Sequence, residues 1–156
     1  MSNTPDAVLT SAAGESLVHV VRELLGWTVV ASPEVRGAPG AGWRTSVSLR
    51  ARDWDGAVTL EFSDRFASEA LQGMLGDPGD AAGARDFAGE LVNMVAGRMA
   101  VRLESTEGTC RLGTPDVRRR EDAETQEGDS SAAGRTDWNC AGHSLSLRVR
   151  SWPLGV

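Results

Sequence analysis

Hydrophobic residues recur at helical spacing in three segments of the chain, and each segment predicts an amphipathic helix. The first helix is expected over residues 12–27, where Gly26 suits its end. The second should begin after an N-cap at Ser63 and run to about residue 75. The third and longest spans roughly residues 84–103. The second helix is expected to turn four side chains inward: Phe66, Ala67, Leu71 and Met74.

Alternating and short apolar runs between these helices predict β-strands. The expected strands are residues 29–31, 43–51, 57–62, 110–112 and 145–152. The tetrapeptide Asp53–Gly56 is typical of the turn of a hairpin. From Arg118 to Asp137 the chain is charged, small and without periodicity, so we expect a mobile surface loop there, with Arg118–Arg120 as a solvated face.

An internal match indicates how these elements are arranged. Residues 32–36 and 114–118 agree in residue type at all five positions, and each segment follows a predicted helix and a short strand. The sequence therefore predicts one α/β layered domain over residues 1–156, with a mainly antiparallel sheet, two long helices and two related halves.

Charge and composition exclude several classes of function. The net charge of −6 argues against binding to a nucleic acid through its phosphate backbone. All sixteen basic residues are arginine, so lysine Schiff-base chemistry is excluded. No apolar stretch is long enough to span a membrane and no secretion signal is apparent at the N-terminus, so a cytoplasmic location is expected.

Two cysteines leave two interpretations open. Cys110 and Cys140 lack any C-x-x-C pairing, and we expect two free or buried thiols. The alternative is a partial metal site in which His143 joins both cysteines.

A narrow stripe of polar and small residues follows one side of the third predicted helix. On a helical wheel the apolar residues lie opposite this stripe, and Gly89 and Ala96 lie on one of its shoulders. Two glycines inside a helix cost about 1 kcal/mol each relative to alanine, so helix stability does not explain them. Four residues fall within roughly 60° of arc and define the stripe: Asp86, Glu90, Asn93 and Gly97.

Three interpretations of this stripe are possible. It can be the solvated face of an ordinary amphipathic helix. It can hold a general acid/base pair, although Asp86 and Glu90 have no histidine or lysine near them in the sequence. It can also be a docking surface, because bare backbone beside projecting polar groups allows another protein to approach closely.

The segment Asp86–Gly97 resembles the D/S-x3-E-x2-N motif helix of the CheC, CheX and FliY phosphatases, and its E-L-x-N-M-x-x-G continuation is closest to CheX-like versions. Upstream, residues 56–62 and the Met-Leu-Gly at 74–76 resemble the strand and short helix that precede the motif in this family. Downstream, residues 112–115 are similar to its proline-containing strand end. The resemblance covers about residues 10–117.

The resemblance implies a CheX/CheC-like fold and a phosphatase that acts on the aspartyl phosphate of a response-regulator receiver domain. By this resemblance Asn93 would position the attacking water, Glu90 would pair with a lysine of the receiver, and Asp86, Gly89 and Gly97 would support docking. The Mg²⁺ would be held by the receiver's own acidic residues, so no cofactor of the chain's own is expected. A CheX-like protein would also be a homodimer.

Two further functions are compatible with the same resemblance. The chain could be an adaptor that binds phosphorylated receivers without hydrolysing the phosphate, or a structural dimer module that binds no receiver. Only one half of the chain carries the E-x2-N pattern, because Glu15 is followed three residues later by Val18. This single stripe fits CheX better than the two-site CheC type.

Overall fold

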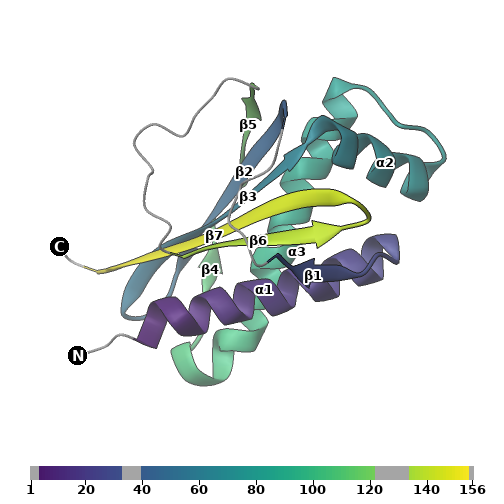
Figure 1. Cartoon of the computed structure of the whole chain (residues 1–156). Helices are drawn as coiled ribbons and strands as arrows, with labels where there is room; N and C mark the ends of the chain where they lie inside the picture. The colour runs from purple at the N-terminus through teal and green to yellow at the C-terminus, as the bar shows by residue number, and fades with distance from the viewer. Residues whose placement is uncertain (1–3, 33–39, 122–133, 155–156) are drawn as a thin grey trace.

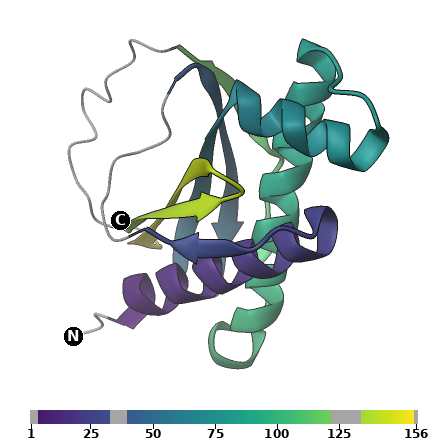
Figure 2. The ribbon, with the colours of Figure 1, turned by 45° about the vertical axis from the view of Figure 1, so that its right-hand side comes forward.

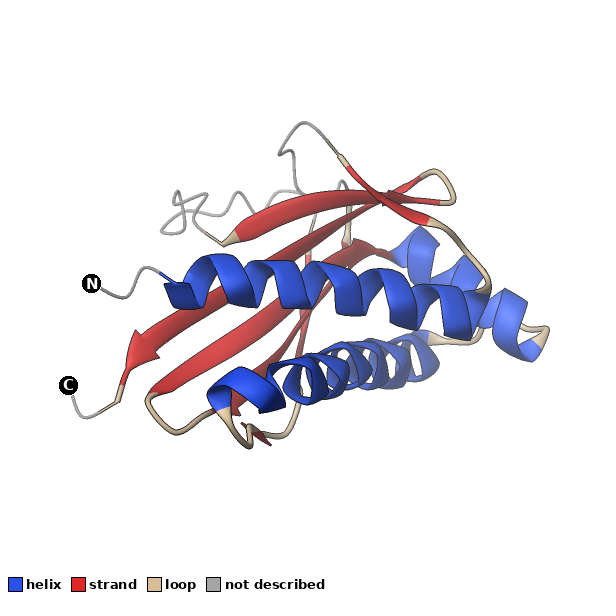
Figure 3. Cartoon of the chain, turned by 90° about the horizontal axis from the view of Figure 1, so that it is seen from below, coloured by secondary structure: helices blue, strands red, loops and turns tan. Residues whose placement is uncertain are grey.

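Three helices cover one face of an antiparallel sheet in the computed structural model, which describes residues 4–32, 40–121 and 134–154 (Figure 1). The helices are α1 (Thr4–Leu25), α2 (Asp64–Leu75) and α3 (Ala81–Glu107). Seen from below, α1 and α3 run side by side in front of the strands (Figure 3). The strands are β1 (Val29–Ala31), β2 (Gly42–Arg50), β3 (Trp54–Ser63), β4 (Arg111–Leu112), β5 (Asp116–Arg120), β6 (Arg135–Cys140) and β7 (His143–Pro153).

The strand order confirms the predicted mixed α/β fold with a mainly antiparallel sheet. In the described residues the order is β1-β6-β7-β3-β2-β4, and β5 also pairs with β2. Each long helix is followed by a short strand, and these two short strands lie toward opposite edges of the sheet. Strand β1 pairs with β6 of the β6–β7 hairpin, and β4 pairs with β2 of the β2–β3 hairpin. The short strand of each half thus pairs with the hairpin of the other half, which is the arrangement expected of two related halves. Residues 33–36 of the matching segments lie outside the described residues.

The core lies between the helices and the sheet. Every second residue of β3 and β7 faces the helices, because side chains alternate between the two faces of a strand. Val58, Leu60, Leu145 and Leu147 are all fully buried, which confirms the alternation predicted for the last strand. The register aligns Leu60 with Leu147, so the two central strands present one continuous apolar surface to the helices.

Helices α1 and α3 are longer than predicted. Helix α1 begins at Thr4, eight residues before the predicted start at Ala12, and it buries Leu9. It ends at Leu25, and Gly26 follows in the left-handed conformation with φ of 71°. Helix α3 begins after the N-cap Asp80, whose carboxylate accepts a hydrogen bond from the Gly83 backbone, and it continues to Glu107.

Helix α2 confirms its predicted ends but not all of its predicted inward residues. The Ser63 hydroxyl accepts a hydrogen bond from the Phe66 backbone at 3.1 Å, and Gly76 ends the helix in the left-handed conformation. Met74 was expected to face inward and is instead 38% exposed. It lies in the last turn, beyond the buried Phe66–Leu71 part of the helix, where Ala70 rather than Met74 completes the buried face.

The hairpin turn between β2 and β3 is shorter than predicted. Trp54, Asp55 and Gly56 belong to β3, and only residues 51–53 connect the strands. Arg50 pairs with Asp55 across the hairpin, and its Nε lies 2.8 Å from the Asp55 carboxylate. This cross-strand ion pair extends the ladder into residues that are typical of a turn.

The prediction of a loop over Arg118–Asp137 was wrong at both ends. Residues 116–120 form β5 and residues 135–140 form β6, while residues 122–133 lie outside the described residues. Arg119 makes an ion pair with Asp64 and lies over the Trp43 ring, and Arg120 is buried beside Glu61. Arg118 and Arg119 are exposed, so the solvated-face interpretation fails only at the buried Arg120. Charges that pair within the fold leave no periodic signal in the sequence.

Candidate functional site

Helix α3 presents the predicted stripe on its outward side. Its buried side packs against the core through Phe87, Ala88, Leu91, Val92, Val95, Ala96, Met99 and Leu103. Asp86 and Glu90 are exposed, and Asn93, one turn further along, is half-buried. The helix period therefore places the carboxylate of Glu90 and the amide of Asn93 on one face, as three-residue spacing requires. Neither side chain is turned into the interior.

The polar groups of this stripe have no partners within the part of the chain that the structure describes. No hydrogen bond or ion pair involves the side chains of Asp86, Glu90 or Asn93 there. Elsewhere on the same helix, Arg98 and Arg102 pair with Glu23 and Glu15 of α1. Polar side chains on the flank of α3 thus serve packing against α1, whereas those of the stripe remain available to another molecule.

Gly89 is not the open backbone that the sequence suggested. A Cβ atom at this position would lie 3.4 Å from Val117 Cγ2 and 3.7 Å from Pro115 Cβ. The Arg85 guanidinium donates to the Val117 carbonyl at 3.2 Å, so the chain leading into β5 forms a wall on this side of the stripe. Both distances are ordinary contacts, so this wall lies beside Gly89 without requiring a glycine there. Ala96, on the same shoulder, is fully buried.

Gly97 lies in a more open place. A Cβ atom there would meet only Leu112 Cδ1, at 3.9 Å, which is an ordinary contact distance. Leu112 on β4 is 37% exposed, and Val101, one helical turn beyond Gly97, is 67% exposed. Sequence reasoning did not include Val101 or Leu112 in the site. The period of the helix was a signal for Val101, because this residue continues the line of Glu90 and Gly97.

The two histidines of the chain are held away from the stripe. His19 pairs with Glu23 on α1, and His143 pairs with Glu69 of α2 through a 2.6 Å contact. The described residues contain no cluster of three or more histidine, cysteine or acidic side chains that could hold a metal ion. Burial raises the pKa of the Cys140 thiol to about 11, so this group is a protonated thiol at neutral pH.

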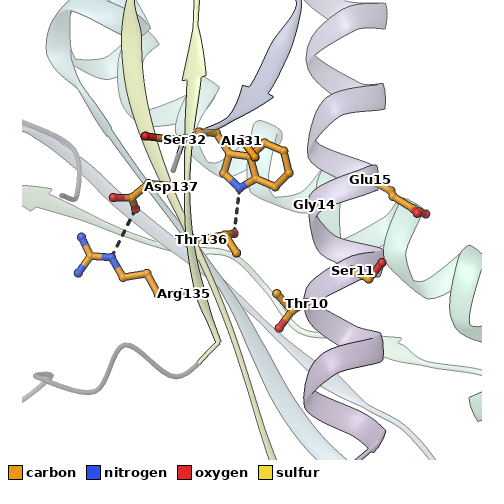
Figure 4. A pocket seen from close by; sticks show the side chains of 10 residues that line it. Thr10, Ser11, Gly14, Glu15, Ala31, Ser32, Arg135, Thr136 and Asp137 are labelled. Atoms are coloured by element: carbon orange, nitrogen blue, oxygen red, sulfur yellow. Dashed lines mark hydrogen bonds and ion pairs between the residues drawn. The ribbon is translucent and has the colours of Figure 1, made fainter. Parts of the chain in front are cut away.

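A cleft of about 360 Å³ lies between α1 and β6 (Figure 4). The Trp138 ring lies against Gly14, and the Trp138 Nε1 donates to the Thr136 hydroxyl at 2.9 Å. Arg135 and Asp137 form an ion pair at 3.5 Å on the other wall. These polar groups bind one another, so the cleft is a packing feature of the sheet edge.

Residues 48–135 match the model of the family described as chemotaxis phosphatase CheX. The matched segment includes β3, α2 and all of α3, and therefore the complete stripe. A search of curated proteins finds no match.

Solved structures share the fold at low sequence identity. The chemotaxis protein CheX from Vibrio vulnificus is 16% identical with a TM-score of 0.80, covering 96% of this chain and 100% of its own. FliY from Thermotoga maritima is 18% identical with a TM-score of 0.65, covering 97% and 92% respectively. CheX from Borrelia burgdorferi, solved in complex with CheY, BeF3 and Mg²⁺, is 11% identical with a TM-score of 0.65, covering 90% and 96%.

No helix among the described residues has the length and the apolar character needed to cross a membrane.

Proposed function

The chain belongs to the chemotaxis phosphatase CheX family, and from this we propose that it hydrolyses the aspartyl phosphate of a CheY-like receiver domain. The family model covers more than half of the chain. The Borrelia burgdorferi CheX was solved with CheY and beryllofluoride, and beryllofluoride stands in for the phosphoryl group of the receiver. From that complex we infer that the partner of the present chain is also a receiver domain.

The observation that carries the proposal is the outward stripe of α3. Glu90 and Asn93 lie one turn apart on one face, and neither has a side-chain partner among the described residues. Residues three apart on a helix have Cβ atoms about 5–6 Å from each other, so both can enter one small site on a partner. A rigid helix packed on the core holds them in place, which is what positioning of reactants requires.

The two side chains have different tasks in this proposal. The Asn93 amide can donate and accept hydrogen bonds but cannot take up a proton, so it orients the attacking water toward phosphorus. The Glu90 carboxylate pairs with a lysine of the receiver and fixes the register of the complex through a charge-assisted hydrogen bond. The receiver's own acids hold Mg²⁺, which neutralises charge on the transferred phosphoryl group.

Other parts of the stripe assist docking. Asp86 is exposed one turn before Glu90 and adds negative charge where a basic partner surface would approach. The net charge of −6 favours encounter with a positively charged face of a partner. We further infer that the protein is a cytoplasmic homodimer, as the family resemblance implies.

Phosphate-release kinetics on a phosphorylated receiver domain test the proposal. Asn93→Ala is expected to lower the rate at saturating receiver about 100-fold, because the water loses its orientation. Glu90→Gln is expected to raise the KM for the receiver by about tenfold while the maximal rate changes less. Asp53→Asn removes an exposed carboxylate in the β2–β3 turn and is the matched control, with unchanged kinetics expected.

The same experiment separates the alternatives. If wild type and Asn93→Ala release phosphate at equal rates, Asn93 has no part in hydrolysis. Binding that depends on Glu90 with an unchanged phosphate lifetime would identify a receiver-binding adaptor. Absence of binding to any receiver, phosphorylated or not, would leave only a structural dimer module.

A further inference from the structure

The stripe continues beyond Asn93 as an apolar surface. Val101 is 67% exposed, which is more than any other large apolar residue of α3 in the described structure. Leu112 of β4 is 37% exposed and its Cδ1 atom lies against the Gly97 position. Val101 is one helical turn from Gly97, so these three residues form one patch, called here the Gly97 patch (Figure 2 shows α3 and its neighbours).

The fold itself gives no reason for glycine at position 97. A methyl group there would make an ordinary contact with Leu112 at 3.9 Å and would meet nothing else within 4 Å. Alanine would also favour the helix, because its backbone loses less conformational freedom on folding than that of glycine. The absence of a side chain at Gly97 therefore lowers stability without improving packing, as happens where another surface must come close.

The patch is within reach of the partner that Asn93 would contact. Val101 follows Asn93 by eight residues, which is about 12 Å along the helix axis. A stable protein interface covers about 800 Å² on each partner and is thus roughly 30 Å across. A receiver centred on Asn93 and Glu90 would cover Val101 and Leu112 as well.

We propose that the Gly97 patch is the apolar half of the receiver-docking surface and determines which receiver binds. This inference rests on the proposed function and names the partner chemistry more closely. The receiver must carry an aliphatic patch about 12 Å from its phosphorylated aspartate. Glu90 and Asn93 act at the phosphorylation site, which all receivers share, so they cannot distinguish one receiver from another. An apolar contact outside that site can do so, because a receiver with a charged group there would have to bury it.

Equilibrium binding of beryllofluoride-activated receiver domains from the same organism tests the inference. Val101→Ala is expected to raise the Kd for the cognate receiver about tenfold, because two methyl groups leave the interface. Val30→Ala is the matched control. Val30 is a valine of similar exposure, 57%, on edge strand β1, and this variant should leave the Kd unchanged.

Gly97→Ala provides a second variant that cannot fail simply by unfolding. It is expected to raise the Tm by about 2–4 °C through helix propensity and to raise the Kd at least tenfold through steric exclusion. A purely structural role for Gly97 would not raise the stability of the protein while weakening its binding to the receiver.

Two readouts keep the inference and the proposed function apart. An unchanged Kd for both Val101→Ala and Gly97→Ala overturns the inference, whatever the rate of phosphate release. An unchanged release rate for Asn93→Ala overturns the proposed chemistry, whatever the Kd values. A Kd that rises for one receiver of the panel and not for the others supports the role of the patch in partner choice.

Discussion

At the scale of single residues, the contact between Glu69 and His143 joins α2 to the β6–β7 hairpin. The His143 Nε2 and the Glu69 carboxylate are 2.6 Å apart, and the imidazole is buried between Trp27 and Phe66. The hydrogen bond from His143, assisted by Arg65, holds the pKa of Glu69 below its usual range. The contact therefore favours the ionised carboxylate in the folded state.

This lowered pKa predicts the direction of a pH effect on stability. A carboxyl whose pKa is lower when folded stabilises the protein above its unfolded pKa of about 4.3, and this contribution is lost as the pH falls through the folded pKa. We expect Glu69→Gln to be less stable than wild type near neutral pH and the difference to shrink in acid. Urea denaturation across that pH range measures it.

The exposed glutamate Glu104 gives the control for this measurement, because its side chain has no partner among the described residues. Glu104→Gln should not change the acid dependence. A difference between wild type and Glu69→Gln that stays constant with pH would contradict the assigned cause.

Single residues differ in how far the sequence could predict them. Glu90 and Asn93 are three positions apart on one helix, so helical geometry alone places them together. Glu69 and His143 are separated by 74 positions, and only the packing of α2 on the hairpin brings them into contact. Gly89 was predicted correctly to lie beside the stripe, but the wall formed by Pro115 and Val117 comes from a distant strand.

At the scale of elements, the start of α2 depends on one hydroxyl group. Ser63 ends β3 and caps α2 by accepting a hydrogen bond from the Phe66 backbone. Ser63→Ala is expected to lower the free energy of unfolding by about 1 kcal/mol, because the first turn loses a bonded N–H group. Chemical denaturation measures the change. Ser68→Ala, inside the same helix, is the control and should be neutral or slightly stabilising.

A cost at Ser68 equal to that at Ser63 would mean that loss of packing rather than loss of the cap explains both variants.

Among the elements, helices and long strands were predicted from periodicity, whereas β5 and β6 were not. Their residues are charged, and several of these charges pair within the fold: Arg119 with Asp64, Arg120 with Glu61 and Arg135 with Asp137. Hydrophobic alternation cannot reveal a strand whose side chains are charged and paired.

At the scale of the whole molecule, the proposed homodimer has a direct test. Strand β5 pairs only with β2 in the described sheet, and an unpaired strand edge is a common place for a second copy to join. Light scattering coupled to size exclusion should give about twice the 16.5 kDa mass of one chain over a range of concentrations. A mass of 16.5 kDa at every concentration would contradict the dimer.

The sequence by itself determined what depends on neighbours along the chain: the three helices, the strands β2, β3 and β7, the cap at Ser63 and the outward line of Asp86, Glu90, Asn93 and Gly97. These follow from a fixed helical or strand period and from local capping. Only the tertiary structure decided the exchange of short strands between the halves, the wall beside Gly89 and the exposed patch of Val101 and Leu112. Each of these requires segments far apart in sequence to meet, and the physical reason is packing of distant surfaces, which no local pattern records.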